Sequence, residues 1–75
     1  MSAAEAQEVR NLLLRSNEQY RQLAARHHQL DDRLHELTEK QYLSDTEQVE
    51  ETTIKKRKLA LKDQMEAMAR DYGPR

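Results

Sequence analysis

The chain has 75 residues, no cysteine and a formal net charge of −1, although 36% of its residues are charged. This length allows one small domain, residues 1–75, and the absence of cysteine excludes disulfides and thiolate metal sites. The small net charge gives no bulk attraction to nucleic acid or to an anionic membrane. No apolar run approaches the roughly 20 residues of a membrane span, and the N-terminal residues do not resemble a secretory signal. We therefore expect a soluble cytoplasmic protein.

The composition favours helix along the whole chain. Its single glycine and single proline are Gly73 and Pro74, and it has no Phe or Trp. Ala, Leu, Glu, Gln, Lys and Arg dominate the remainder, and these residues are good helix formers. We therefore predict an all-α fold without a sheet.

A first helix is predicted over about residues 4–39, which contain no helix breaker. Its apolar residues are spaced by three and four, as in a heptad repeat. Ser16 and His27 are polar members of this stripe. The whole stripe consists of Val9, Leu13, Ser16, Tyr20, Leu23, His27, Leu30, Leu34 and Leu37.

A second helix is predicted over about residues 45–71, after a turn at about 40–44. Ser44 and Glu47 have the spacing of a capping box, in which each side chain accepts a hydrogen bond from the other residue's amide. Gly73 suits the end of a helix and Pro74 prevents its continuation, which leaves residues 72–75 as a tail. The stripe of this helix consists of Ile54, Lys58, Leu61, Met65, Met68 and Tyr72.

The two stripes match when the helices run antiparallel. Pairing them outward from the turn centres the reversal between Tyr42 and Leu43, where the capping box also places a break. We therefore predict an antiparallel, coiled-coil-like two-helix hairpin. A single straight helix in a long coiled coil is the alternative, because no glycine or proline marks the break. The predicted hairpin seam consists of Leu13, Tyr20, Leu23, His27, Leu30, Leu34, Leu37, Ile54, Lys58, Leu61, Met65, Met68 and Tyr72.

This register also predicts contacts around the turn and between charged residues. Tyr42 and Leu43 are expected to fold under the turn, over Leu34 and Leu37. Among the charges flanking the seam, Asp31 is expected beside Lys55, and Arg33 beside Glu50. Exposed ion pairs of this kind contribute at most about 1 kcal/mol each, so they select the register only weakly.

A layer of only two helices leaves one side of the seam open. Leu12, Leu14, Val49 and Leu59 lie off the seam and would remain uncovered. We therefore predict a homo-oligomer, with a dimer of four helices favoured. A monomeric hairpin with scattered exposed leucines is the alternative. The methionine-rich end of the second helix could also bind a helix of a partner protein.

Two segments resemble a known family. Residues 27–34 (HHQLDDRL) contain a His-x-x-Leu-Asp-x-x-Leu pattern, and residues 55–65 (KKRKLALKDQM) contain a Lys-Lys-x-Lys-Leu-x-Leu-Lys-Asp-x-Met pattern. Both patterns, at about this separation, resemble the YdcH-like family of small bacterial proteins, and the likeness extends over roughly residues 20–66. The resemblance implies a cytoplasmic helical hairpin. It implies no activity and supplies no catalytic residues.

The histidines do not predict a metal site. His28 and His35 are about 10 Å apart along a helix, whereas zinc needs three or four ligands around one ion. His27 lies on the seam opposite Lys58, with Asp31 one turn away, where its carboxylate could accept a hydrogen bond from His27 or from the Lys58 ammonium. This polar layer is expected to fix register and oligomeric state, and a pH switch through His27 is the alternative. We predict no catalytic, metal or cofactor-binding residues and no cofactor.

The basic stretch at residues 55–62 suggests a second function. Four consecutive residues fan over about 300° of a helix, so residues 55–58 form no single patch, and Glu51 can pair with Lys55. A non-enzymatic helical interaction module is therefore the predicted function. A small nucleic-acid-binding protein is the alternative. The contacts in that alternative would be made by Lys55, Lys56, Arg57 and Lys62.

Overall fold

The computed structural model describes residues 2–72, which form three α-helices and no strand. The helices are α1 (Ala3–Ser16), α2 (Glu18–Thr38) and α3 (Asp45–Tyr72). The predicted all-α class is confirmed. Gly73 and Pro74, predicted at the end of the last helix, lie outside the described residues. No helix in the described part of the chain combines the length and apolar character that a bilayer span requires.

The prediction of one helix over residues 4–39 is wrong, because the chain leaves helical geometry at Asn17. This residue is extended, with φ −121° and ψ 110°, and its side-chain oxygen accepts a hydrogen bond from the Tyr20 amide at 2.9 Å. Asn17 therefore ends α1 and caps α2. Asparagine side chains compete with the helical hydrogen-bond pattern in this way, which is why asparagine is favoured at N-caps and not inside helices.

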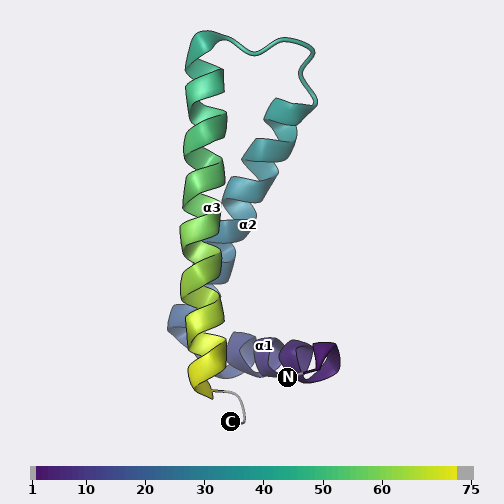
Figure 1. Cartoon of the computed structure of the whole chain (residues 1–75), viewed down its shortest axis with the longest axis vertical. Helices are drawn as coiled ribbons and strands as arrows, with labels where there is room; N and C mark the ends of the chain where they lie inside the picture. Colours follow the sequence, from purple (N-terminus) through teal and green to yellow (C-terminus); the bar gives the residue numbers. More distant parts are fainter. Residues whose placement is uncertain (1, 73–75) are drawn as a thin grey trace.

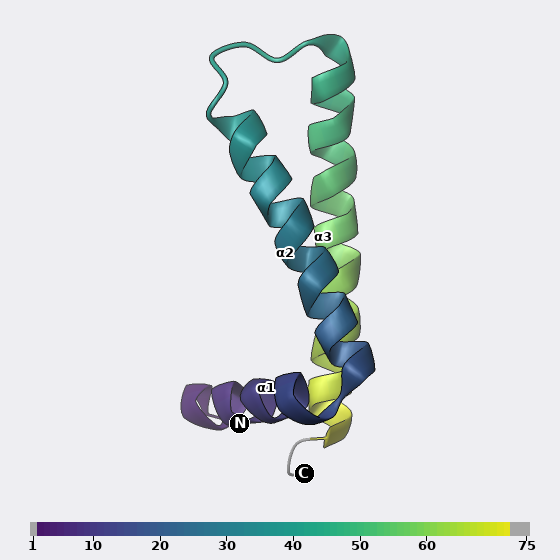
Figure 2. The ribbon, with the colours of Figure 1, turned by 180° about the vertical axis from the view of Figure 1, so that it is seen from behind.

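The three helices form an open, elongated arrangement of 46 × 23 × 16 Å. α2 and α3 run antiparallel and pack against each other, and they diverge toward the loop that joins them (Figure 1). α1 lies across the C-terminal end of α3, and its N-terminal half projects away from the other helices, as the reverse view also shows (Figure 2). The predicted two-helix hairpin is thus replaced by a three-helix arrangement, as a consequence of the break at Asn17.

The core is small and is concentrated where the three helices meet. Val9 and Leu13 of α1 and Tyr20 of α2 form a buried cluster against α3. The α3 residues packed against this cluster are Met65, Met68 and Ala69. Leu23, Leu37 and Ile54 are the other buried apolar residues, and they lie along α2 and α3. The junction of α1 with α3 is therefore held mainly by apolar contacts.

The chain reverses direction between Thr38 and Asp45. The predicted capping box is formed: the Ser44 side chain accepts from the Glu47 amide at 3.1 Å, and the Glu47 carboxylate accepts from the Ser44 amide at 3.0 Å. The expectation that Tyr42 folds under the turn is wrong, since Tyr42 is 83% exposed. Leu37 is fully buried and Leu43 is half-buried, although Tyr42 does not fold under the turn.

Candidate functional site

The structure places the residues of the predicted hairpin seam at different depths. Five are buried, namely Leu13, Tyr20, Leu23, Leu37 and Ile54. Seven are half-buried, namely His27, Leu30, Leu34, Lys58, Leu61, Met65 and Met68. Tyr72, at the last position of α3, is 51% exposed. Burial is thus deepest near α1 and at isolated points along α2 and α3, and it is incomplete elsewhere.

A polar layer lies halfway along α2 and α3. The Lys58 ammonium donates a hydrogen bond to the Asp31 carboxylate, in place of the Lys55 partner that the register predicts. This bond, together with the charge of Lys58, lowers the pKa of Asp31 below its ordinary value. Positive charge on His27 or His28 would lower the Asp31 pKa further. His27 and Lys58 also line the same groove, which is described below. Lys58 thus already has a carboxylate partner on α2.

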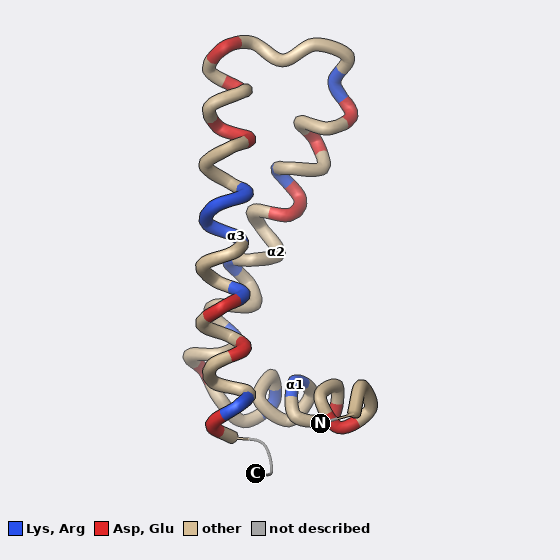
Figure 3. Tube along the Cα trace, in the orientation of Figure 1, with Lys and Arg blue, Asp and Glu red and all other residues tan. Residues whose placement is uncertain are grey.

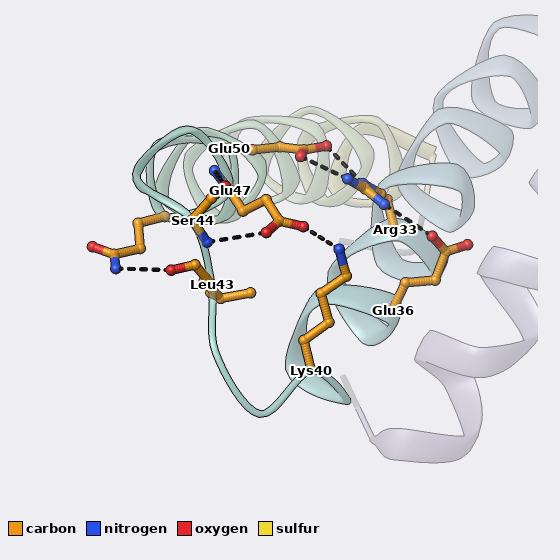
Figure 4. Close-up of polar contacts among 8 residues, drawn as sticks. Arg33, Glu36, Lys40, Leu43, Ser44, Glu47 and Glu50 are labelled. Atoms are coloured by element: carbon orange, nitrogen blue, oxygen red, sulfur yellow. Dashed lines mark hydrogen bonds and ion pairs between the residues drawn. The ribbon is translucent and has the colours of Figure 1, made fainter.

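Arg33 links α2 to α3 near the loop (Figure 4). Its guanidinium donates two hydrogen bonds to the Glu50 carboxylate, at 2.7 and 2.9 Å, and one to Glu36 at 3.0 Å. The predicted contact of Arg33 with Glu50 is therefore present. The guanidinium lowers the pKa of Glu50, and the two carboxylates raise the pKa of Arg33. Such a bidentate contact restricts the rotation of α2 about its own axis relative to α3.

Glu47 joins the capping box to α2. Its carboxylate accepts hydrogen bonds from the Lys40 ammonium and from the Ser44 amide (Figure 4). The bond from Lys40 and then the bond from Ser44 lower the pKa of Glu47 from its ordinary 4.5 to about 2. The acidic residues at the start of α3 are thus largely occupied in holding the loop and α2.

A groove lies between α1 and the C-terminal half of α3, and we call it the α1–α3 groove. It has a volume of about 840 Å³. Its apolar lining includes Tyr20, Leu59, Met65 and Ala69. Tyr20 is buried, whereas Leu59 is 60% exposed. The groove is therefore an open apolar trough on the surface of the helices.

The rim of the α1–α3 groove is basic. Its charged lining residues are Arg10 from α1 and Lys58, Lys62, Glu66 and Arg70 from α3. Arg10 lies close enough to Tyr20 for its charge to lower the Tyr20 pKa, although burial, the larger effect, raises it. Four cations and one anion thus line a groove on a chain whose net charge is −1.

The charges are unevenly distributed along the molecule. Acidic residues gather around the loop end of α2 and α3, whereas a run of basic residues lies in the middle of α3 (Figure 3). Lys55, Lys56, Arg57 and Lys62 are all exposed. Lys55 pairs with Glu51 at 3.5 Å, and Lys62 lines the groove. Of the four candidate nucleic-acid contacts, Lys62 lines the α1–α3 groove and Lys56 lines a separate shallow depression on α3, so the four do not share one concave surface.

Comparison with known families supports the resemblance seen in the sequence. The family model for "Protein of unknown function (DUF465)" matches residues 21–69, about two thirds of the chain. The chain belongs to the DUF465 family. This family contains the YdcH-like proteins, so the predicted relationship is confirmed. The comparison with curated proteins found no match. No solved structure matched the chain either.

The DUF465 match begins four residues after Asn17 and ends at residue 69, so it covers most of α2 and most of α3 but not α1. The α3 wall of the α1–α3 groove lies almost wholly within the match, whereas Arg10 and Ala6, which form its α1 wall, lie outside it. The family match therefore carries no information on the α1 side of the groove.

The histidines form no metal centre within the described residues. His28 lies 3.4 Å from the Asp32 carboxylate, and His35 lies 3.0 Å from that of Glu39. Each pair is a separate contact within α2, and no group of three or more potential ligands converges in residues 2–72. His27 instead lines the α1–α3 groove beside Lys58.

Sequence reasoning missed the groove and two of its cations, Arg10 and Arg70. The groove, and the presence of Arg10 and Arg70 in one lining, depend on the position of α1. A continuous first helix would have aligned α1 with α2. The consecutive polar residues Ser16 and Asn17, followed by Glu18 in the first turn of α2, were the available signal for the break.

Proposed function

We propose that this DUF465 protein is a non-enzymatic helical interaction module of the cytoplasm, which acts by self-association or by binding a helix of a partner protein. The incomplete burial of its helices is the observation that supports this. Its radius of gyration is 15.0 Å, against about 11 Å for a compact domain of this length. A chain this open gains stability by covering its apolar surface with another molecule.

Several large apolar residues are available for such contacts. Leu12 and Leu14 of α1 are 37% and 39% exposed, and Val49 and Leu59 of α3 are 67% and 60% exposed. We propose that self-association covers part of this surface in a dimer with a four-helix arrangement at its centre. Single exposed leucines are common on protein surfaces and would not support the proposal by themselves. The support comes from their position on helices that bury little of their surface against one another.

Sedimentation equilibrium over a concentration series tests self-association. We expect the apparent mass to rise from that of one chain toward that of two between low and high micromolar concentration, while the helical circular dichroism signal rises or stays constant. A fully helical protein that remains monomeric at high micromolar concentration would contradict the self-association half of the proposal.

Nucleic-acid binding is a second candidate, favoured by the exposed side chains of Lys56 and Arg57. Neither residue forms an ion pair with another residue of the described part of the chain. The acidic loop end and the net charge of −1 act against it. Titration of labelled DNA and RNA at two salt concentrations tests this candidate, because phosphate contacts make affinity fall steeply with salt.

A further inference from the structure

The cations around the α1–α3 groove are mostly unpaired. Arg10, Lys62 and Arg70 are exposed, and none forms an ion pair with a carboxylate of residues 2–72, whereas Lys58 is held by Asp31. Glu66 also lines the groove without pairing to any of them. Three unsatisfied cations thus surround an apolar trough, which fits an occupant that is apolar on one face and acidic at the edges of that face.

The length of the groove fits a short helix. Its α3 wall extends from Lys58 to Arg70, which is about 18 Å along the helix axis, or about three turns. A helix lying in such a groove contacts its floor through apolar residues on one face, at spacings of three and four. Leu59, Met65 and Ala69 provide apolar contact surface along α3, and the methionine adapts to different apolar side chains.

A second copy of the chain fits the groove poorly. The exposed acidic residues of α1 are Glu5 and Glu8, and at about 100° per residue they lie about 140° to 160° around the helix from Arg10. The acidic side of α1 therefore faces away from the groove that its own Arg10 helps to form. Contact between the acidic side of α1 in one copy and the groove of another would therefore need each copy to engage through opposite sides of α1.

Nucleic acid also fits the groove poorly. The aromatic residue in the lining, Tyr20, is buried at 3% exposure and presents no ring face for base stacking. Glu66 lies among the cations and would repel a phosphate chain. A helix can place carboxylates beside Lys62 and Arg70 and an uncharged residue opposite Glu66, whereas a nucleic-acid backbone carries a phosphate at every nucleotide.

We propose that the α1–α3 groove binds an acidic amphipathic helix of another protein, with its apolar face on Leu59 and Met65 and its carboxylates beside Arg10, Lys62 and Arg70. This inference rests on the proposed function. Where that function is the binding of a partner helix, the inference names the chemical class of that helix. It assigns α1 a role in binding, because Arg10 completes the cationic rim.

A designed peptide tests the assignment with the full-length chain. The probe is a fluorescein-labelled helix of about 15 residues, with leucines spaced by three and four and glutamates flanking them, and binding is followed by fluorescence anisotropy. A peptide with glutamine at every glutamate position keeps the apolar face and removes the charge. We expect the acidic peptide to bind, and the glutamine peptide to bind roughly tenfold more weakly or worse.

Two charge-matched variants locate the binding site. R10E/K62E reverses two cations of the groove, and R15E/R26E reverses two exposed cations that do not line it. Both change the net charge equally. We expect R10E/K62E to weaken peptide binding by roughly tenfold or more and R15E/R26E to leave it within about twofold. Circular dichroism of both variants verifies that the helices are retained.

The outcomes separate this inference from the function on which it rests. If the chain self-associates in the ultracentrifuge but does not bind the peptide, or binds it equally in both variants, the groove assignment is wrong and the interaction module stands. Loss of self-association in R10E/K62E would show that a second copy occupies the groove and would overturn the assignment of another protein. Preference for a labelled oligonucleotide over the peptide would overturn it as well. A chain that neither self-associates nor binds the peptide contradicts both proposals.

Discussion

The two ends of the molecule are held together by different forces. At the loop end, α2 and α3 diverge and are connected by charged contacts, chiefly Arg33 with Glu50 and Lys40 with Glu47, in addition to the buried Leu37. At the other end, α1 is attached through the buried side chains of Leu13 and its neighbours, packed against the methionines of α3. A short chain with a small core has therefore divided its stabilisation between an ionic end and an apolar end.

This difference predicts different responses at the two ends. Exposed ion pairs contribute little stability in water and are screened by salt. Apolar burial contributes more and is insensitive to moderate salt. The α1 end is also where the candidate groove lies, so a substitution that loosens α1 should affect binding, whereas one at the loop end should not.

The largest effect is expected from Leu13→Ala at the apolar end. Leu13 is 1% exposed in the cluster that attaches α1, and truncating a buried leucine to alanine costs about 2–5 kcal/mol. For a chain of this size that is a large share of the total stability. We expect a marked loss of helicity at 25 °C or a much lower urea midpoint, measured by circular dichroism.

Leu14→Ala is the matched control on the next position of α1. Leu14 is 39% exposed, so the same change removes far less buried surface and should cost less than about 1 kcal/mol. Equal effects of Leu13→Ala and Leu14→Ala would mean that α1 does not pack as described.

The next largest effect is expected from Asn17→Ala at the junction of α1 and α2. The substitution removes the side-chain oxygen that accepts from the Tyr20 amide, and loss of an asparagine cap costs about 0.5–2 kcal/mol. Asn11→Ala is the control, because Asn11 lies inside α1 with an exposed side chain and caps nothing. Urea unfolding of both variants measures the difference.

Small-angle scattering of Asn17→Ala adds a second measurement, the maximum dimension of the molecule. An increase in maximum dimension together with increased helicity would show that α1 and α2 had merged into one straight helix. In that case the position of α1 across α3 would depend on Asn17 alone and not on the apolar cluster.

The part of the fold that could be predicted from the sequence is the part set by local signals. Composition predicted the all-helical class, and the capping box of Ser44 and Glu47 predicted the start of α3. The break at Asn17 could not be read from periodicity, because the heptad spacing continues through Leu13, Ser16 and Tyr20 as if the helix were unbroken. A single capping residue can end a helix even where the heptad spacing of the apolar residues continues.

The candidate site was less predictable than the fold. Lys62 was identified from the basic stretch, but its neighbours in the groove, Arg10 and Arg70, are distant in sequence and carry no motif. They come together only because α1 turns across α3, and that turn depends on the missed break. The ionic contacts were more predictable, since Arg33 has its predicted partner Glu50 and Asp31 binds Lys58, one of the two lysines that the sequence offered it.

A smaller effect is expected from Glu50→Gln at the ionic end. The amide cannot replace the charge that Arg33 binds at 2.7 and 2.9 Å, so we expect a lower melting temperature in low salt, with a smaller decrease than in Leu13→Ala. In 1 M salt, where the screening length is about 3 Å, the difference from the wild type should shrink. Glu66→Gln is the control, because Glu66 forms no ion pair in the described part of the chain. A decrease that persists unchanged in 1 M salt would show that Glu50 acts by packing.

The smallest effect is expected from the titration of Glu47, which NMR of its side-chain carboxyl measures directly. Its pKa is lowered in the folded chain to about 2 from an ordinary 4.5, so the ionised form stabilises the fold above about pH 4.5 and this contribution disappears as the pH falls toward 2. Glu47→Gln keeps an acceptor for the Ser44 amide but does not titrate. The wild type should therefore melt at a higher temperature than Glu47→Gln at pH 7, and the two should converge near pH 2.

Lys40→Met identifies the cause of this shift. Since the Lys40 hydrogen bond is the largest influence on Glu47, its removal should raise the Glu47 pKa toward 4.5, while the capping bond to Ser44 still holds it below that value. A wild-type titration midpoint near 4.5 would show that the loop does not hold Lys40 against α3. The ionic end would then be open in solution, and the apolar cluster at α1 would be the main attachment between the helices.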